Sequence, residues 1–160
     1  MFRKLTLAAP LLAALGAAVV LAPASAGAAE TACKPGKTTV NGKAAVRFCG
    51  PAKASATVGA KRFTFSGGVC STSGLYFTIN IGTIVTNTVA GAKPGPTTYF
   101  GATVTPPDSG VHLKQALSWT SGGKAYSALG NRVTLQTGLR RGSFSGTSLT
   151  GQKIRGTFTC

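Results

Sequence analysis

The feature that most constrains this chain is a series of short runs in which apolar and polar residues alternate. In the segment LYFTINIG, Leu75, Phe77, Ile79 and Ile81 occupy every second position. Because successive side chains of a β-strand point to opposite faces, this spacing predicts half-buried strands. Glycine, of which the chain has 22, divides the runs, and helical periodicity is absent after the amino terminus. We therefore predict an all-β domain over residues 46–160, a small antiparallel β-sandwich or partly open barrel.

Pairs of turn-forming residues between the runs predict hairpins. Ser73-Gly74 precedes the run LYFTINIG, Gly122-Gly123 separates QALSWTS from KAYSAL, and Gly130-Asn131 precedes RVTLQT. Glycine and asparagine adopt the left-handed backbone conformation that two-residue hairpin turns require. We expect each of these pairs to join antiparallel neighbours.

The amino terminus has the three parts of a secretory signal peptide. Arg3 and Lys4 give a positive start, an apolar stretch follows, and Ala24-Ser25-Ala26 supplies small residues for cleavage. We predict a helical, cleavable signal peptide over residues 1–26, and hence a secreted or cell-wall-associated protein. The uninterrupted apolar run is shorter than the roughly 20 residues of a membrane span, so no transmembrane segment is expected after its removal. The turn-rich segment 27–45 is expected to form an irregular arm.

Four cysteines remain after cleavage, and an even number in an exported chain indicates disulfides. They are Cys33, Cys49, Cys70 and Cys160, and no two of them have the C-x-x-C spacing of a zinc or thioredoxin-like site. Three pairings are possible for four cysteines. We predict Cys33–Cys49, which fastens the arm to the first strand, and Cys70–Cys160, which fixes the terminal strand onto an early one.

The charge of the chain is strongly one-sided, with 17 Lys and Arg residues against two acidic residues. Removal of the signal peptide takes away two cations and lowers the formal net charge from +15 to +13. Such a surface attracts polyanions, which outside a cell are anionic wall polymers or lipid head groups. The candidate contacts are Arg140, Arg141, Lys153 and Arg155. The bases are too scattered for a specific nucleic-acid-binding tract, and the alternative is that the charge only keeps the domain soluble.

The residues for most catalytic chemistries are missing. Glu30 in the arm and Asp108 in a loop are the only carboxylates, which argues against paired acid–base catalysis. Asp108, Ser109 and the single histidine, His112, lie too close together on one segment to face one another as a triad. Neither a metal-ligand cluster nor a phosphate-binding glycine loop is present, so no metal and no cofactor is expected.

Two short segments carry a family resemblance. GVCSTSGLYFTINIG, from Gly68 to Gly82, places a cysteine before a small-residue turn and a strand, and IRGTFTC ends on Cys160. Over about Gly67 to Cys160, the sequence resembles the surface lipoprotein antigens of mycobacteria. The resemblance implies a small secreted β domain exposed at the envelope and recognised by the immune system, without catalytic residues. The sequence departs from this family because it has no lipid-attachment cysteine and because it adds the pair Cys33 and Cys49.

The combined expectation is a secreted or envelope-associated, non-enzymatic protein that contacts anionic envelope polymers or lipid head groups through its basic surface. One alternative is a surface-display protein with no defined ligand. A second, from another class, is a small secreted hydrolase that uses His112. The sequence does not name the ligand.

Overall fold

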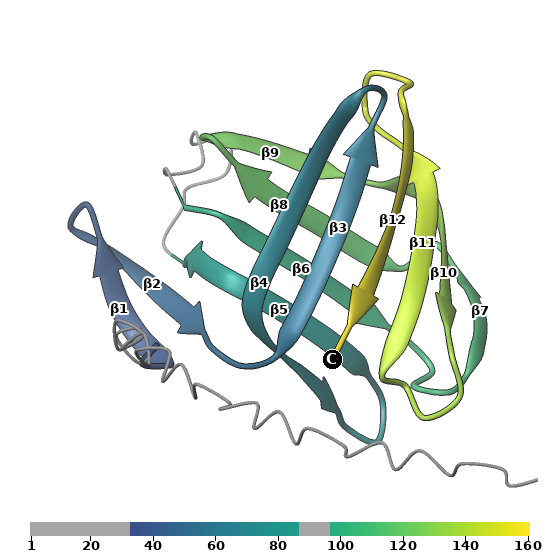
Figure 1. The fold of residues 1–160 in the computed structure, drawn as a ribbon, viewed down its shortest axis with the longest axis horizontal. Coiled ribbons are helices and arrows are strands. Elements are labelled where there is room, and N and C mark those ends of the chain that lie inside the picture. The colour runs from purple at the N-terminus through teal and green to yellow at the C-terminus, as the bar shows by residue number, and fades with distance from the viewer. Residues whose placement is uncertain (1–32, 87–96) are drawn as a thin grey trace, which may run out of the picture. The chain divides into compact units, whose positions relative to one another are not determined.

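The structure is a computed structural model that describes residues 33–86 and 97–160, in which every regular element is a β-strand. The predicted all-β class is confirmed, while the predicted signal peptide, residues 1–26, lies outside the described residues. The strands, labelled in Figure 1, are β1 (Gly36–Val40), β2 (Lys43–Phe48), β3 (Ala52–Val58), β4 (Lys61–Thr72), β5 (Phe77–Val85), β6 (Tyr99–Val104), β7 (Gly110–Leu113), β8 (Ala116–Ser121), β9 (Lys124–Ser127), β10 (Leu129–Leu135), β11 (Arg141–Thr147) and β12 (Lys153–Thr159).

One antiparallel sheet contains all these strands and curls around a single core. Hydrogen-bonded neighbours follow the order β7-β10-β11-β12-β3-β4-β5-β6-β8-β9, and the hairpin of β1 and β2 joins through a pairing of β2 with β5. In Figure 1, β4, β3, β12 and β11 cross over β5, β6 and β8. The sheet therefore has two facing halves, as predicted for a sandwich or partly open barrel.

Strand β4 belongs to both halves of the sheet. Its residues 61–66 pair with β3, and its residues 68–72 pair with β5. The change of partner falls at Gly67, whose φ of +79° favours glycine, next to an irregularity in the ladder with β3. At Gly68 a side chain would collide with the backbone of Ile81 on β5. The two glycines therefore let one strand bend and let the halves approach.

The predicted hairpin turns have two different outcomes. Ser73-Gly74 joins β4 to β5 and Gly122-Gly123 joins β8 to β9, so both predictions are confirmed. The prediction for Gly130-Asn131 is wrong, because β9 and β10 do not pair and the two residues form an irregularity inside β10. The physical reason is that the Asn131 side chain is buried and hydrogen-bonded to the backbone of Gln115 and Ala128 instead of lying in an exposed turn.

Asn131 closes a gap between the two halves of the sheet. Strand β7 leads into β8 across residues 114–115, and β9 leads into β10 across Ala128. At these breaks the Asn131 Oδ1 accepts a hydrogen bond from the Gln115 N–H at 2.8 Å. The Asn131 Nδ2 donates to the carbonyl oxygens of Gln115 and Ala128 at 2.5 and 2.9 Å. One amide side chain thus satisfies three backbone groups that the interrupted ladder leaves unpaired.

We predict that Asn131→Ala lowers the free energy of unfolding by about 2–4 kcal/mol, because three backbone groups lose their partner in a site that is 2 % exposed. Denaturant titration measures the change. The control, Gln136→Ala, removes an exposed amide next to β10 and should change the stability by about 0.5 kcal/mol or less. Equal effects of the two substitutions would contradict this role of Asn131.

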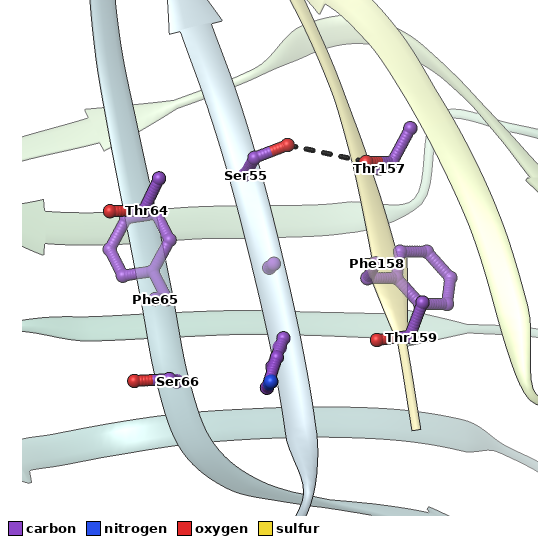
Figure 2. Close-up of a pocket in the computed structure, with 9 residues that line it drawn as sticks. Ser55, Thr64, Phe65, Ser66, Thr157, Phe158 and Thr159 are labelled. Carbon is purple, nitrogen blue, oxygen red and sulfur yellow. Dashed lines mark hydrogen bonds between the residues drawn. The ribbon is translucent and has the colours of Figure 1, made fainter. Parts of the chain in front are cut away.

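The core contains the inward-facing residues of both halves. Phe77, Ile79 and Ile81 are buried as the alternation predicted, whereas Leu75 is 67 % exposed because it lies in the turn before β5. Figure 2 shows Phe65 and Phe158 on the strands beside β3, whose inward side chains are the small residues Ala52, Ala54, Ala56 and Val58. The ring of Phe100 lies 5.4 Å from that of Phe65 and 5.6 Å from that of Phe144, measured between centroids. Gly156 faces Phe144 in the ladder between β11 and β12, and a Cβ there would collide with the ring. Glycine at this position therefore makes room for an aromatic side chain.

The segment predicted as an irregular arm, residues 27–45, is in part a regular hairpin. Strands β1 and β2 pair from Gly36–Arg47 to Val40–Lys43, and Asn41-Gly42 forms the turn with both residues at positive φ. This corrects the expectation, because a two-residue Asn-Gly turn between extended segments is a hairpin signal even where the strands are poor in large apolar residues. Residues 27–32 lie outside the described part of the chain.

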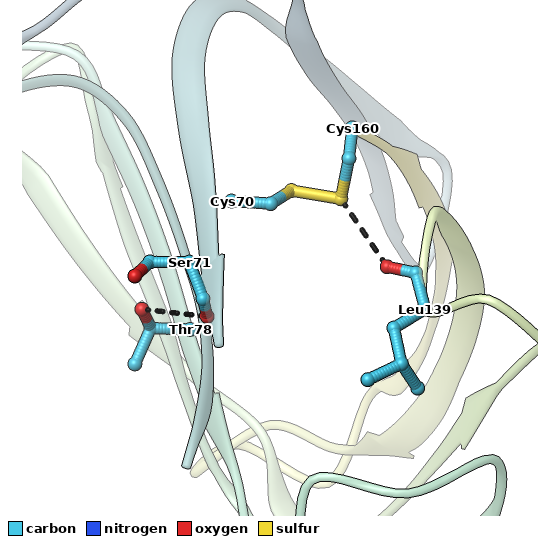
Figure 3. Close-up of a disulfide and its surroundings, with 5 residues drawn as sticks. All are labelled: Cys70, Ser71, Thr78, Leu139 and Cys160. Carbon is cyan, nitrogen blue, oxygen red and sulfur yellow. Dashed lines mark hydrogen bonds between the residues drawn. A yellow bond between two sulfur atoms is a disulfide. The ribbon is translucent and has the colours of Figure 1, made fainter. Parts of the chain in front are cut away.

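Both predicted disulfides are present. Cys33 is linked to Cys49 and Cys70 to Cys160, with Cα–Cα distances of 5.8 and 5.5 Å. The second bond connects β4 to the end of β12, and Leu139 lies beside it (Figure 3). A disulfide sulfur carries no proton, so the approach of Cys160 Sγ to the Leu139 carbonyl oxygen, 3.5 Å, is a packing contact.

We predict that Cys70→Ser with Cys160→Ser lowers the melting temperature more than Cys33→Ser with Cys49→Ser. The Cys70–Cys160 bond closes a separation of 90 residues and packs against the core. The Cys33–Cys49 bond closes a separation of 16 residues, and Cys33 is exposed. Chain entropy makes these closures worth roughly 4.5 and 3 kcal/mol. Calorimetry of both variants under oxidising conditions measures the difference, and a larger loss from the Cys33–Cys49 variant would contradict the prediction.

Candidate functional site

Charged residues are unevenly divided between the two halves of the sheet. Strands β5, β6 and β8 contain none, and on this side of the sheet the cations Lys43, Arg47 and Lys124 are on the flanking strands β2 and β9. The strands of the facing half carry exposed, outward-pointing cations, namely Lys53, Arg62, Arg132, Arg141, Lys153 and Arg155. Asp108 has the one acidic side chain in the described ranges, and its Oδ1 lies 3.3 Å from His112 Nε2. No acidic side chain of the described residues therefore lies among these cations.

The register of the ladders arranges the outward side chains of β4, β3, β12, β11 and β10 in three rows, which together we name the basic face. The first row is Ser66, Lys53, Thr159 and Arg141; the middle row is Thr64, Ser55, Thr157, Ser143 and Thr134; the third row is Arg62, Thr57, Arg155, Ser145 and Arg132. Adjacent strands are about 4.8 Å apart and successive rows about 7 Å apart. An uncharged row of hydroxyls thus lies between two rows in which cations and hydroxyls alternate.

Strand β3 forms the floor of two open hollows in the basic face, because its outward side chains include only one long one. The first hollow, of about 370 Å³, is lined by Lys53, Ser55, Thr64, Ser66, Thr157 and Thr159 among others (Figure 2). The second, of about 540 Å³, is lined by Thr57, Gly59, Gln152, Lys153 and Arg155. The two hollows follow one another along β3. Within the first hollow, Ser55 and Thr157 share a hydrogen bond of 3.2 Å between their hydroxyl oxygens.

Of the predicted polyanion contacts, the structure brings three onto one surface. Arg141 and Arg155 belong to the rows of the basic face. Lys153 lies two residues before Arg155, on the same side of β12. Arg140 is exposed in the turn before β11, outside the rows. The sequence analysis missed Lys53, Arg62 and Arg132, because their proximity depends on the order of strands that are far apart in the chain.

His112, the residue of the alternative hydrolase hypothesis, is buried at 7 % exposure on β7. Its Nε2 lies 3.0 Å from the Asp108 carbonyl oxygen and 3.3 Å from Asp108 Oδ1. Among the described residues, no serine or threonine hydroxyl forms a hydrogen bond with this ring. The contacts therefore tie the loop before β7 to the strand.

Two further properties concern the described ranges alone. They contain no group of three or more His, Cys, Asp or Glu side chains placed to hold a metal ion. They also contain no helix with the length and hydropathy that a membrane span needs.

Comparison with protein-family models, with curated proteins and with solved structures finds no match for this chain. The resemblance to the mycobacterial surface lipoprotein antigens therefore stays a prediction from the segments around Cys70 and Cys160. The chemistry of the surface has to be argued from the residues themselves.

The outward side of strands β5 and β6 is polar but carries no charge. The Tyr99 hydroxyl donates a hydrogen bond of 2.6 Å to Asn80 Oδ1, and Phe48 of β2 packs against the Tyr99 ring at a centroid distance of 6.1 Å. Burial raises the pKa of the Tyr99 phenol above its ordinary value of 10.0. The folded state therefore favours the protonated phenol more than the unfolded chain does.

This raised pKa predicts a loss of stability in alkaline solution. Because the folded pKa lies above the unfolded one, the contribution of Tyr99 is complete below pH 10.0 and is lost as the pH rises through the folded pKa. Denaturant unfolding on both sides of that pH should show a smaller alkaline loss for Tyr99→Phe than for the wild type. The exposed Tyr76 supplies the control, and a Tyr76→Phe variant that flattens the curve equally would contradict the assignment to Tyr99.

Proposed function

We propose that this protein is a secreted or envelope-associated, non-enzymatic binding protein whose basic face holds anionic polymers of the cell envelope. The observation that carries the proposal is the segregation of charge. One half of the sheet presents the cations of the basic face, and the strands β5, β6 and β8 of the facing half have no charged residue. The proposed location is supported by two disulfides, which are typical of proteins that mature in an oxidising compartment.

The attraction is electrostatic and acts over a surface that is open to solvent. Exposed charges are screened within about 10 Å at 0.1 M salt and about 3 Å at 1 M salt. Retention of the purified protein on isolated envelopes should therefore fall steeply with salt concentration. The cations of one row are about 10 Å apart, two strand spacings, so that several of them act together on one polymer at low salt.

We predict that the triple variant Lys53→Gln, Arg141→Gln, Arg155→Gln binds envelopes about tenfold more weakly than the wild type at low salt. Each exposed ionic contact contributes about 0.5 kcal/mol, and three together approach the 1.4 kcal/mol of a tenfold change. The matched control is Lys37→Gln, Lys43→Gln, Arg47→Gln, which removes the same charge from exposed positions of the hairpin of β1 and β2.

Sedimentation of each variant with isolated envelopes gives the bound fraction over a salt series. The control should bind like the wild type. Equal losses in both variants would show that net charge acts without a defined face. Salt-independent retention of the wild type would overturn the electrostatic proposal, and absence of retention would favour a display protein without a ligand.

A further inference from the structure

The order of chemical groups along β3 points to more than a charged surface. Lys53, Ser55 and Thr157 line the first hollow, with the two hydroxyls on the side toward residue 57, and Arg155 with Lys153 lines the second hollow. From residue 53 to residue 57, the strand extends about 13 Å. A ligand lying along β3 therefore meets a cation, then a stretch with hydroxyls alone, then further cations.

The middle stretch selects among anionic ligands. A serine or threonine hydroxyl both donates and accepts hydrogen bonds, as the hydroxyls of a sugar do. In the hydrogen bond between Ser55 and Thr157, one hydroxyl donates and the other accepts. The proton of the accepting hydroxyl and the remaining lone pairs of both oxygens stay available for hydrogen bonds to a ligand. Thr64 faces Ser55 from β4 and adds another hydroxyl. A polyanion without hydroxyl groups has no donor for the acceptor sites of this stretch, whereas a sugar hydroxyl can both donate to and accept from it.

A lipid bilayer fits the groove less well than a polymer chain. None of the exposed large apolar side chains that could enter a bilayer belongs to the rows of the basic face; they are Leu75, Tyr76, Val111, Leu113, Leu129 and Leu149. The outward side chains that line the first hollow from β4 and β12 are Thr64, Ser66, Thr157 and Thr159. Their hydroxyls can form hydrogen bonds with the hydroxyls of a polymer chain.

We propose that the groove along β3 binds an extended anionic glycan, with its acidic groups on the cations at both ends and its sugar hydroxyls on Ser55, Thr64 and Thr157. This inference rests on the proposed function of the basic face and names the ligand class of that face. It assigns the specificity to uncharged side chains, which a purely electrostatic surface would not use.

The test changes hydroxyls and leaves every charge in place. The groove variant is Ser55→Ala with Thr157→Val, which removes a facing pair of hydroxyls on β3 and β12. The matched control is Thr78→Val with Thr103→Val, which removes a facing pair of hydroxyls on β5 and β6. Two probes separate the contributions: polygalacturonate carries carboxylates and sugar hydroxyls, whereas polyphosphate carries charge without hydroxyls. Calorimetric titration of the wild type and both variants at one low salt concentration gives the dissociation constants, and thermal melting establishes that each variant is folded.

The expected result is an about tenfold weaker affinity of the groove variant for polygalacturonate, with unchanged affinity for polyphosphate. The control should bind both probes like the wild type. If the groove variant is unfolded, Thr64→Val, on an exposed position of β4, serves in its place with an expected loss of about fivefold.

Three outcomes would overturn the inference. Wild-type affinity of the groove variant for polygalacturonate would exclude the hydroxyls, and equal losses for both probes would indicate a damaged surface. Tighter binding of the wild type to anionic lipid vesicles than to polygalacturonate would assign the face to membranes. Failure of the wild type to bind either polymer or the vesicles would instead refute the proposed function itself.

Discussion

Strand β4 serves both halves of the sheet, and the arrangement of the molecule depends on its change of partner at Gly67-Gly68. A Cβ at Gly68 would collide with the backbone of β5, so any other residue there would push the halves apart. Cys70 follows this bend directly, and its bond to Cys160 ties the end of β12 across it. The covalent link thus holds together strands that the bend has brought into position.

The packing of the core also determines which side chains lie on the outer surface of the sheet. Ala54 of β3 faces Phe65 of β4 and Phe158 of β12 in the ladders, so small residues alternate with large ones inside the core. A shift of one residue in either ladder would bury Lys53 or Ser55 and expose the alanines. The burial of the aromatic rings therefore determines the register, and the register determines which hydroxyls and cations form each row of the basic face.

Local patterns in the sequence predict what depends on neighbouring residues. The alternation in LYFTINIG predicts strand β5, and the four cysteines predict two bonds whose pairing follows from the arm and the terminal strand. The role of Asn131 could not be predicted, because its partner Gln115 is far away in the chain and becomes a neighbour only in the folded sheet. The three predicted contacts on the basic face belong to adjacent strands β11 and β12, whereas Lys53 and Arg62 join them through the pairing of β12 with β3.

Solubility alone does not account for where the charge lies. A net charge keeps a domain dispersed wherever it is placed, and spreading the cations would reduce their mutual repulsion. Strands β5, β6 and β8 offer outward positions such as Thr78, Thr103 and Thr120, yet none of these strands has a charged residue. Placing the cations of the basic face on adjacent strands costs free energy in the unbound protein, and a polyanion lying among them would offset that cost. This placement is the reason why we propose an anionic ligand for the basic face.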